Sequence, residues 1–414
     1  MGDKHPTNAK KKQVIDQQPY LSDDFIIEEI LTRLPVKSVL RFKSVSKQWY
    51  SALSSSEFAN VHLMRSPFSH PSAPVNSLFI KNLKNYYLVS FDDDDQISGN
   101  FEDNMFKLDV DFGIEYEEYL QFIGCSNGLI CLTIFFHPSL VSISDDSYLI
   151  LWNPATRKLH KYESGCYLKH MDDDGRSAFV ARGFGYASSV DDYKYVRILR
   201  FLGRNKRNTI IVHIFSVREN KWRKIDFDFD FDCYFDPQGR AMLIDEKLYW
   251  ESLRMSGDRI VIGSFDLEVE RFEIHEFNLG DPDFFFDSFN SLLGVMGDCL
   301  SKLVNSMTNR SDTLMHILES PTRTKSICLP KGLLLDKCSQ MIGFTKTGKI
   351  FVTGGFRSDV VRDDRSNYQS ALQLLDIGRK PMQHSILMKF NGLVNIAKYV
   401  PSFASPCPIE LSKT

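Results

Sequence analysis

Apolar residues recur at helical spacing between residues 21 and 53, and this pattern predicts a group of three short helices. Ile26, Ile30 and Leu34 lie four residues apart, which places them on one face of a helix. Ser22 precedes this run as a suitable N-cap, and Pro35 ends the helix directly after Leu34. Two further apolar repeats predict the second and third helices: Val39, Leu40 and Phe42, then Val45, Trp49 and Leu53.

This helical segment carries more apolar side chains than it can bury by itself. A chain of roughly 30 to 40 residues seldom forms a well-buried core without a partner. We therefore expect part of its apolar surface to be covered by another protein.

Beyond residue 75 the pattern changes to short β-branched and aromatic runs, which are typical of strands. From residue 120 a tight turn leads into an apolar strand at 126–128, 191–192, 245–247, 297–298 and 347–349. A second element, in which two strands flank a polar turn, follows at 151–159, 214–222, 264–272 and 374–378, with a degenerate copy at 317–319.

The two-part repeat has a period of about 50 to 65 residues, close to that of a kelch-like β-propeller blade. Each unit has room for the four strands of one blade. A β-sandwich would not explain the two-part repeat equally well. The copy near 310–330 is shortened and lacks the usual Trp, so the pattern leaves the fifth blade in doubt.

Residues 21–63 resemble the F-box of plant F-box proteins. The resemblance is carried by Ile30-Leu31-Thr32-Arg33-Leu34-Pro35-Val36-Lys37-Ser38 and Arg41-Phe42-Lys43-Ser44-Val45-Ser46-Lys47-Gln48-Trp49. The family usually begins this module with Leu-Pro, whereas here Ser22 follows Leu21. Because serine can also cap a helix, the change is compatible with the module.

The region from 75 to 405 is similar to the F-box-associated domain of the F-box/kelch and S-locus F-box group. The matching segments include 124–132, 151–158, 183–186, 191–194, 222–225, 264–267 and 343–344. The resemblance implies a small all-α module followed by an all-β, kelch-like propeller. It divides the chain into a disordered polar tail (1–20), an F-box (21–63), a linker (64–74), a target-recognition domain (75–405) and a second tail (406–414).

In such proteins the F-box binds a Skp-type adaptor, and through it a cullin. The resemblance therefore implies the non-catalytic substrate receptor of an SCF-type E3 ubiquitin ligase, which promotes ubiquitination and proteasomal degradation of its target. The residues that correspond to the adaptor-binding surface are Leu21, Ile26, Ile30, Leu31, Leu34, Pro35, Val36, Leu40, Phe42, Val45 and Trp49.

Composition and charge argue against several other classes of function. A net charge of −3 argues against general binding to nucleic acid or to a membrane surface. No apolar run reaches the roughly 18 residues of a membrane-spanning helix. Residues 1–20 lack the apolar core of a signal peptide, and the eight cysteines form no C-x-x-C pair. Reduced thiols in the cytoplasm or the nucleus are the expected state.

Residues 124–128 fit the hydrolase pattern G-x-S-x-G around Ser126. A nucleophile elbow requires a strand, a sharp turn and a helix, whereas both flanks of this segment have the pattern of strands. We therefore interpret it as a hairpin turn. No glycine follows in the register of a calcium-binding EF-hand loop at 226–232. We interpret the acidic clusters at 92–95, 172–174 and 226–232 as solvated faces, and no metal or cofactor is expected.

The target surface is expected in the segments between repeat elements, since loops carry recognition while strands carry packing. The candidate segments are 164–180, 226–240 and 281–290, which contain several acidic residues and suit a basic partner. The individual candidates are Asp172, Asp173, Asp174, Asp228, Asp230 and Phe285. Two alternative functions stay open: a propeller scaffold that acts without a ligase, and a propeller hydrolase.

Overall fold

The computed structural model divides the chain into two compact units, residues 1–65 and residues 66–414. The structure describes residues 21–70, 72–92, 97, 99, 101–114, 120–134, 148–163, 178–202, 208–226, 234–235, 240–253, 259–278, 293–305, 313–320, 323–329, 333, 339–357 and 368–407.

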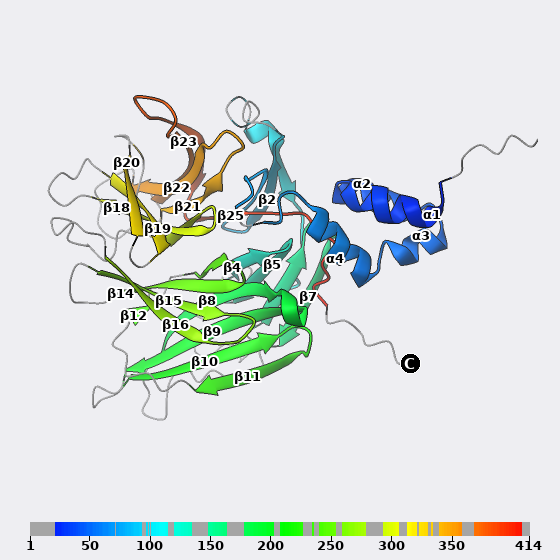
Figure 1. Cartoon of the computed structure of the whole chain (residues 1–414), viewed down its shortest axis with the longest axis horizontal. Helices are drawn as coiled ribbons and strands as arrows, with labels where there is room; N and C mark the ends of the chain where they lie inside the picture. Colours follow the sequence, from blue (N-terminus) through cyan, green and yellow to red (C-terminus); the bar gives the residue numbers. More distant parts are fainter. Residues whose placement is uncertain are drawn as a thin grey trace, which may run out of the picture. The chain divides into compact units, whose positions relative to one another are not determined.

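The described part of the first unit, residues 21–65, is helical throughout its regular structure and is called the helical module below (Figure 1). Its elements are α1 (Asp23–Phe25), the π-helix η1 (Ile26–Ile30), the 3-10 helix η2 (Leu31–Arg33), α2 (Val36–Phe42), α3 (Lys47–Ala52) and α4 (Ser56–Arg65). The first three form one continuous helical run. Ser22 is its N-cap, as predicted, because the Ser22 hydroxyl accepts a hydrogen bond from the Phe25 N–H at 3.3 Å. Helix α4 is a fourth element that the apolar spacing over 21–53 did not include.

Arg65 at the end of α4 fastens this helix to the first helical run. Its guanidinium donates to the Thr32 hydroxyl at 2.7 Å and to the Glu29 carboxylate at 3.1 Å, and it also donates to the Glu28 carbonyl. The Thr32 hydroxyl donates to the same Glu28 carbonyl at 2.6 Å. The module buries its own core around Ile27, Leu31, Val39, Trp49, Leu53 and Phe58.

The second unit is a six-bladed β-propeller, and five of its blades, 2 to 6, follow one another along the chain (Figure 1). Blade 2 contains β4 (Leu120–Ser126), β5 (Leu129–Ile134), β6 (Tyr148–Asn153) and β7 (Lys158–Glu163). Blade 3 contains β8 (Ala178–Ala187), β9 (Asp192–Leu202), β10 (Asn208–Ser216) and β11 (Lys221–Asp226). Blade 5 contains β17 (Leu293–Met296), β18 (Cys299–Asn305), β19 (Thr313–Ser320) and β20 (Arg323–Cys328). Blade 6 contains β21 (Gln340–Phe344), β22 (Ile350–Arg357), β23 (Tyr368–Asp376) and β24 (Gln383–Asn391).

Blade 4 has an interrupted inner edge. Both β12 (Tyr234–Phe235) and β13 (Met242–Ile244) pair with β14 (Lys247–Leu253), which is followed by β15 (Arg259–Asp266) and β16 (Phe272–Asn278). The fifth blade, which the shortened repeat left in doubt, has all four strands. In this blade β19 and β20 pair with a register shift between Leu318 and Ser320.

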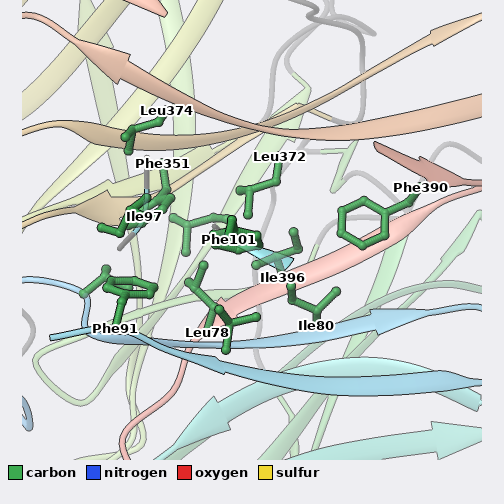
Figure 2. Close-up of a cluster of buried hydrophobic side chains, with 13 residues drawn as sticks. Leu78, Ile80, Phe91, Ile97, Phe101, Phe351, Leu372, Leu374, Phe390 and Ile396 are labelled. Carbon is green, nitrogen blue, oxygen red and sulfur yellow. The ribbon is translucent and has the colours of Figure 1, made fainter. Parts of the chain in front are cut away.

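Blade 1 closes the ring by combining strands from the two ends of the propeller. It contains β1 (Ser77–Asn82), β2 (Asn85–Ser90) and β3 (Met105–Leu108), and its inner strand is the last strand of the chain, β25 (Val394–Lys398). Strand β25 pairs antiparallel with β1, from Leu78 opposite Lys398 to Asn82 opposite Val394. Figure 2 shows the core beside this closure, where Ile80 and Ile396 of blade 1 pack with Phe351 and Leu372 of blade 6.

The alternating strand directions give the propeller two different faces. The turn face carries the short connections from the first to the second strand of blades 2 to 6, at 127–128, 188–191, 245–246, 297–298 and 345–349. Left-handed backbone at Asn127, Asp191 and Asp245, with φ between 45° and 49°, makes several of these turns tight. The loop face carries the connections between successive blades and those from each second to each third strand.

Candidate interaction surfaces

The helical module exposes a set of large apolar side chains. Their exposed fractions are 52% for Leu21, 49% for Phe25, 40% for Ile30, 58% for Val45, 60% for Tyr50 and 81% for Met64. Exposed apolar side chains at this density are typical of a protein-binding surface.

The structure separates the eleven predicted adaptor-binding residues into three groups. Leu21, Ile30, Pro35 and Val45 are exposed; Ile26, Leu34, Leu40 and Phe42 are half-buried; Leu31, Val36 and Trp49 are buried. The buried residues hold the module together and position the exposed ones. Contact with an adaptor stays a prediction for the exposed and half-buried positions.

Three exposed apolar residues of the module were missed from the sequence. Phe25 lies beside the predicted stripe, Tyr50 follows the buried Trp49, and Met64 lies on α4. The signal for Phe25 and Tyr50 was present as aromatic residues within the resembling segment. Met64 has no such signal because its exposure depends on how α4 packs.

Charged groups stabilise the module's framework. Hydrogen bonds from Arg65 and Arg33 lower the pKa of the Glu29 carboxyl. His62 is buried, and its Nε2 lies 2.8 Å from the Leu34 carbonyl oxygen, directly before Pro35. Burial lowers the pKa of the His62 imidazole despite this hydrogen bond, so its neutral form is favoured in the folded module.

The C-terminal segment after β25, residues 399–407, is bound along the turn face of blade 2. The Asn153 side-chain amide donates to the carbonyls of Ser402 at 3.1 Å and Ala404 at 2.8 Å. The Tyr162 hydroxyl donates to the Pro406 carbonyl at 2.6 Å, and the Ser402 hydroxyl donates to the Asn127 carbonyl. This part of the turn face is therefore covered by the chain itself.

The segment that precedes β1 lies on the turn face of blades 1 and 6. Lys398 Nζ donates to the carbonyls of His70 at 2.9 Å and Ala73 at 2.8 Å, and the Val75 N–H donates to the Phe344 carbonyl at 2.8 Å. Val75 is 2% exposed and packs into the core between these two blades. The loop face, by contrast, is where the described strands that flank the three predicted target-binding segments end or begin.

The individual target-binding candidates Asp172, Asp173, Asp174, Asp228, Asp230 and Phe285 lie outside the residues that the structure describes. The flanking strands are described: β7 and β11 end, and β8 and β17 begin, on the loop face. On the same face, Leu83 in the β1–β2 turn and Leu393 in the connection from β24 to β25 are 58% and 53% exposed. Leu83 has a left-handed φ of 52°, which is uncommon for a leucine.

The G-x-S-x-G segment forms a hairpin turn between β4 and β5, as predicted. Ser126 is the last residue of β4 and is 6% exposed, and Asn127 and Gly128 turn directly into β5. Burial raises the pKa of the neighbouring Cys125 thiol to about 12, so this thiol is protonated at neutral pH. Among the described residues, no three His, Cys, Asp or Glu side chains are placed to hold a metal ion.

A cavity of about 650 Å³ lies along the propeller axis. All six inner strands line it, through Phe122, Phe184, Leu243, Val295, Ile342 and Ala397. The described helices include none that is long and apolar enough to cross a membrane.

Comparison with known proteins agrees with this architecture. The F-box domain family matches residues 21–60, and the F-box associated beta propeller domain family matches residues 77–318. A helical F-box module followed by a six-bladed propeller defines the class, and the chain belongs to the family of plant F-box proteins with an F-box-associated β-propeller domain.

Its relatives include an F-box/kelch-repeat protein of Arabidopsis thaliana, which is 30% identical over 60% of this chain and 63% of the relative. F-box protein CPR1 of the same plant is 25% identical over 74% of this chain and 73% of the relative. The chain thus matches just under two thirds of the length of the first relative. Among solved structures, the Aleuria aurantia lectin matches 77% of this chain and 91% of its own, with a TM-score of 0.36 and 11% identity; a likeness at this level says nothing of function.

Proposed function

We propose that this chain is the substrate-recognition subunit of an SCF-type E3 ubiquitin ligase. The helical module binds a Skp-type adaptor, and through it a cullin, while the propeller binds the target protein. The chain itself performs no catalysis, and it acts by holding a target lysine near the ubiquitin-charged enzyme, which raises the effective concentration of the reacting groups. The target is then ubiquitinated and degraded by the proteasome.

The observation that carries the proposal is the exposed apolar set on the helical module. Val45, Tyr50 and Met64 are each more than half exposed, although the module has its own buried core. Burial of one such side chain against a partner contributes roughly 1.5–3 kcal/mol. A few of these contacts are enough for a stable complex with an adaptor.

Binding of the full chain to a purified Skp-type adaptor tests this part of the proposal. Ile30→Asp and Val45→Asp each place a charge in the proposed interface and should weaken binding at least tenfold. Val269→Asp is the matched control, because Val269 is 70% exposed but lies in the propeller. If the wild-type chain binds no Skp-type adaptor at micromolar concentration, the chain is a ligase-independent scaffold instead.

The loop face is the proposed target surface of the propeller. Support comes from the turn face, where residues 399–407 and the segment around Ala73 already cover parts of three blades. The acidic segments 164–180, 226–240 and 281–290 favour a target with a basic surface, whose association should slow as salt concentration rises.

Affinity capture with proteasome activity blocked identifies the target and supplies the next test. Changing Asp172, Asp173 and Asp174 together to Asn should reduce target capture while adaptor binding stays unchanged. Matching changes at 226–232 and 281–287 extend the test. If all three leave target capture unaltered, the acidic surface is not the recognition site, although the adaptor proposal stands.

We also propose that the protein acts in the cytoplasm, the nucleus or both. Cys125, Cys131, Cys299, Cys328 and Cys407 are free thiols, which suits a reducing compartment. Localisation of a fluorescently tagged full chain tests this proposal directly.

A further inference from the structure

The axial cavity has the size and the wall of a ligand site. Its volume of about 650 Å³ lies within the range of roughly 300–1,000 Å³ found for small-molecule pockets. Each inner strand is terminal in its sheet. Except where they are already bonded, as at Arg182 of β8, which bridges to Arg240 and accepts the Ala241 N–H, the inner strand edges can supply backbone N–H and C=O groups along the axis, beside the side chains of six blades.

Both ends of the cavity are narrowed by parts of the propeller unit. Towards the loop face, the Arg240 guanidinium lies 5.3 Å from the centre of the Phe122 ring of blade 2 and donates to Gln340 of blade 6 at 3.0 Å. Towards the turn face, His70 and Ala73 line the cavity, and Lys398 holds this segment through its two carbonyl contacts. A space of this volume suits a small molecule better than a polypeptide segment.

The wall combines aromatic rings with a negatively charged end. The half-buried Tyr186 and Phe344 supply the rings, while Phe122 and Phe184 line the cavity but have side chains that are buried in the blade cores. At the turn-face end the cavity is lined by four carboxylates and two ammonium groups: Asp245, Glu246, Asp266, Glu268, Lys247 and Lys398. Lys247 pairs with Asp266 at 3.3 Å, and Lys398 is bound to the two carbonyls.

The framework positions the Glu246 carboxylate directly. One of its oxygens, Oε2, accepts the Ser188 backbone N–H at 2.9 Å, across the boundary between blades 3 and 4. The nearby Tyr186 hydroxyl donates to Asp191 at 2.5 Å. Burial, together with the negative charges of Asp191, Glu246 and Asp192, raises the pKa of Tyr186. With four carboxylates against two ammonium groups in the lining, the formal charge at this end of the cavity is negative.

We propose that the axial cavity binds a small organic cation. Its apolar body lies against the half-buried Tyr186 and Phe344 rings, and its ammonium group lies beside Glu246. Aromatic faces attract cations that have left bulk water, and the carboxylate adds a charged partner. This ligand site goes beyond target recognition on the loop face and does not depend on adaptor binding.

Three probes of similar size and different charge test the proposal on the full chain. Isothermal titration calorimetry with phenethylamine should give saturable binding with one site per chain. The neutral 2-phenylethanol should bind at least tenfold more weakly, and phenylacetate should show no binding. The proposal is overturned if phenethylamine gives no saturable heat up to about 10 mM, or if phenylacetate binds with equal affinity. The concentration range is chosen because a ligand with so few non-hydrogen atoms is expected to bind with roughly millimolar affinity.

Substitution locates the bound cation. Glu246→Gln keeps an oxygen that can accept the Ser188 N–H but removes the charge, and it should weaken phenethylamine binding at least fivefold. Glu219→Gln is the matched control, because Glu219 is an exposed turn-face acid outside the cavity lining. Glu268→Gln provides a second variant at the cavity end if Glu246→Gln alters thermal unfolding. Unchanged affinity in the folded Glu246 and Glu268 variants rejects the assigned cation position.

Discussion

The Asn153 side-chain amide donates a hydrogen bond to the Ser402 carbonyl, 249 residues further along the chain, at 3.1 Å. The same amide group also donates to Ala404 at 2.8 Å, and the Asn153 side-chain oxygen accepts the N–H groups of Ala155 and Thr156. Asn153 has no exposed surface. One side chain therefore both shapes the turn after β6 and binds the C-terminal segment to blade 2.

Asn153→Ala should destabilise the propeller by at least about 2 kcal/mol, because it removes the Asn153 partner of the Ser402 and Ala404 carbonyls and of the Thr156 N–H, while the Ala155 N–H keeps the Tyr399 hydroxyl at 3.3 Å. Denaturant unfolding of the full chain measures this loss. Thr156→Ala is the matched control in the same turn and should change the free energy of unfolding by under about 0.5 kcal/mol. Equal stability of the Asn153 variant and the wild type contradicts a structural role for this contact.

Gly294→Ala should destabilise the contact between blades 5 and 6. A Cβ at Gly294 would lie 2.9 Å from both the Cβ and the carbonyl oxygen of Met341, so backbone has to move. Overpacking of this kind typically costs about 1–3 kcal/mol. Gly378→Ala is the control, since its Cβ would meet only Asp376 at 3.5 Å. Thermal unfolding should separate the two variants, and similar melting temperatures would count against a tight contact at Gly294.

Arg65→Ala should loosen the helical module by about 1–3 kcal/mol, because Arg65 bonds Glu28, Thr32 and Glu29 at once. Hydrogen exchange of the amides in η1 and η2 measures this change locally. Arg33→Ala is the matched control, since Arg33 also bonds Glu29 but its side chain is 62% exposed. An exposed pair of this kind contributes about 0–1 kcal/mol. Equal protection in both variants would show that Arg65 does not fasten α4.

The free energy of unfolding should increase with pH above pH 8, because Lys81 loses its proton more readily in the folded chain. Burial lowers the pKa of this ammonium from 10.5 to about 8. Between these values the unfolded chain retains the proton that the folded chain has released, so the free energy of unfolding increases with pH. Relative to Lys81→Met, the wild type should gain at most about 1.4 kcal/mol per pH unit in this window.

Denaturant unfolding between pH 7 and pH 10 measures the Lys81 contribution. Lys84→Met, on the exposed tip of the same hairpin, is the control and should keep the wild-type slope. The folded-state pKa of Tyr186 is raised above its ordinary value of about 10. Tyr186 therefore lowers the free energy of unfolding with increasing pH only above about pH 10. A Lys81→Met slope equal to the wild-type slope from pH 8 to 10 contradicts the prediction.

The sequence by itself determined the local elements and their repetition. Ser22 and Pro35 limit the first helical run, and the turns at Asn127, Asp191 and Asp245 begin the second strands of three blades. These features depend on capping, backbone freedom and apolar spacing over a few residues, so local patterns predict them. The two resemblances also gave the order of the module and the propeller.

Only the tertiary structure decided which of these residues face outwards and how distant segments meet. Leu31 and Ile30 are adjacent in the sequence, yet they are 1% and 40% exposed because α4 packs on one side of the helical run. The pairing of β25 with β1 joins residues at the two ends of the propeller, and no local pattern specifies that register. The axial cavity likewise exists only when six blades close into a ring, since each blade supplies only part of its wall.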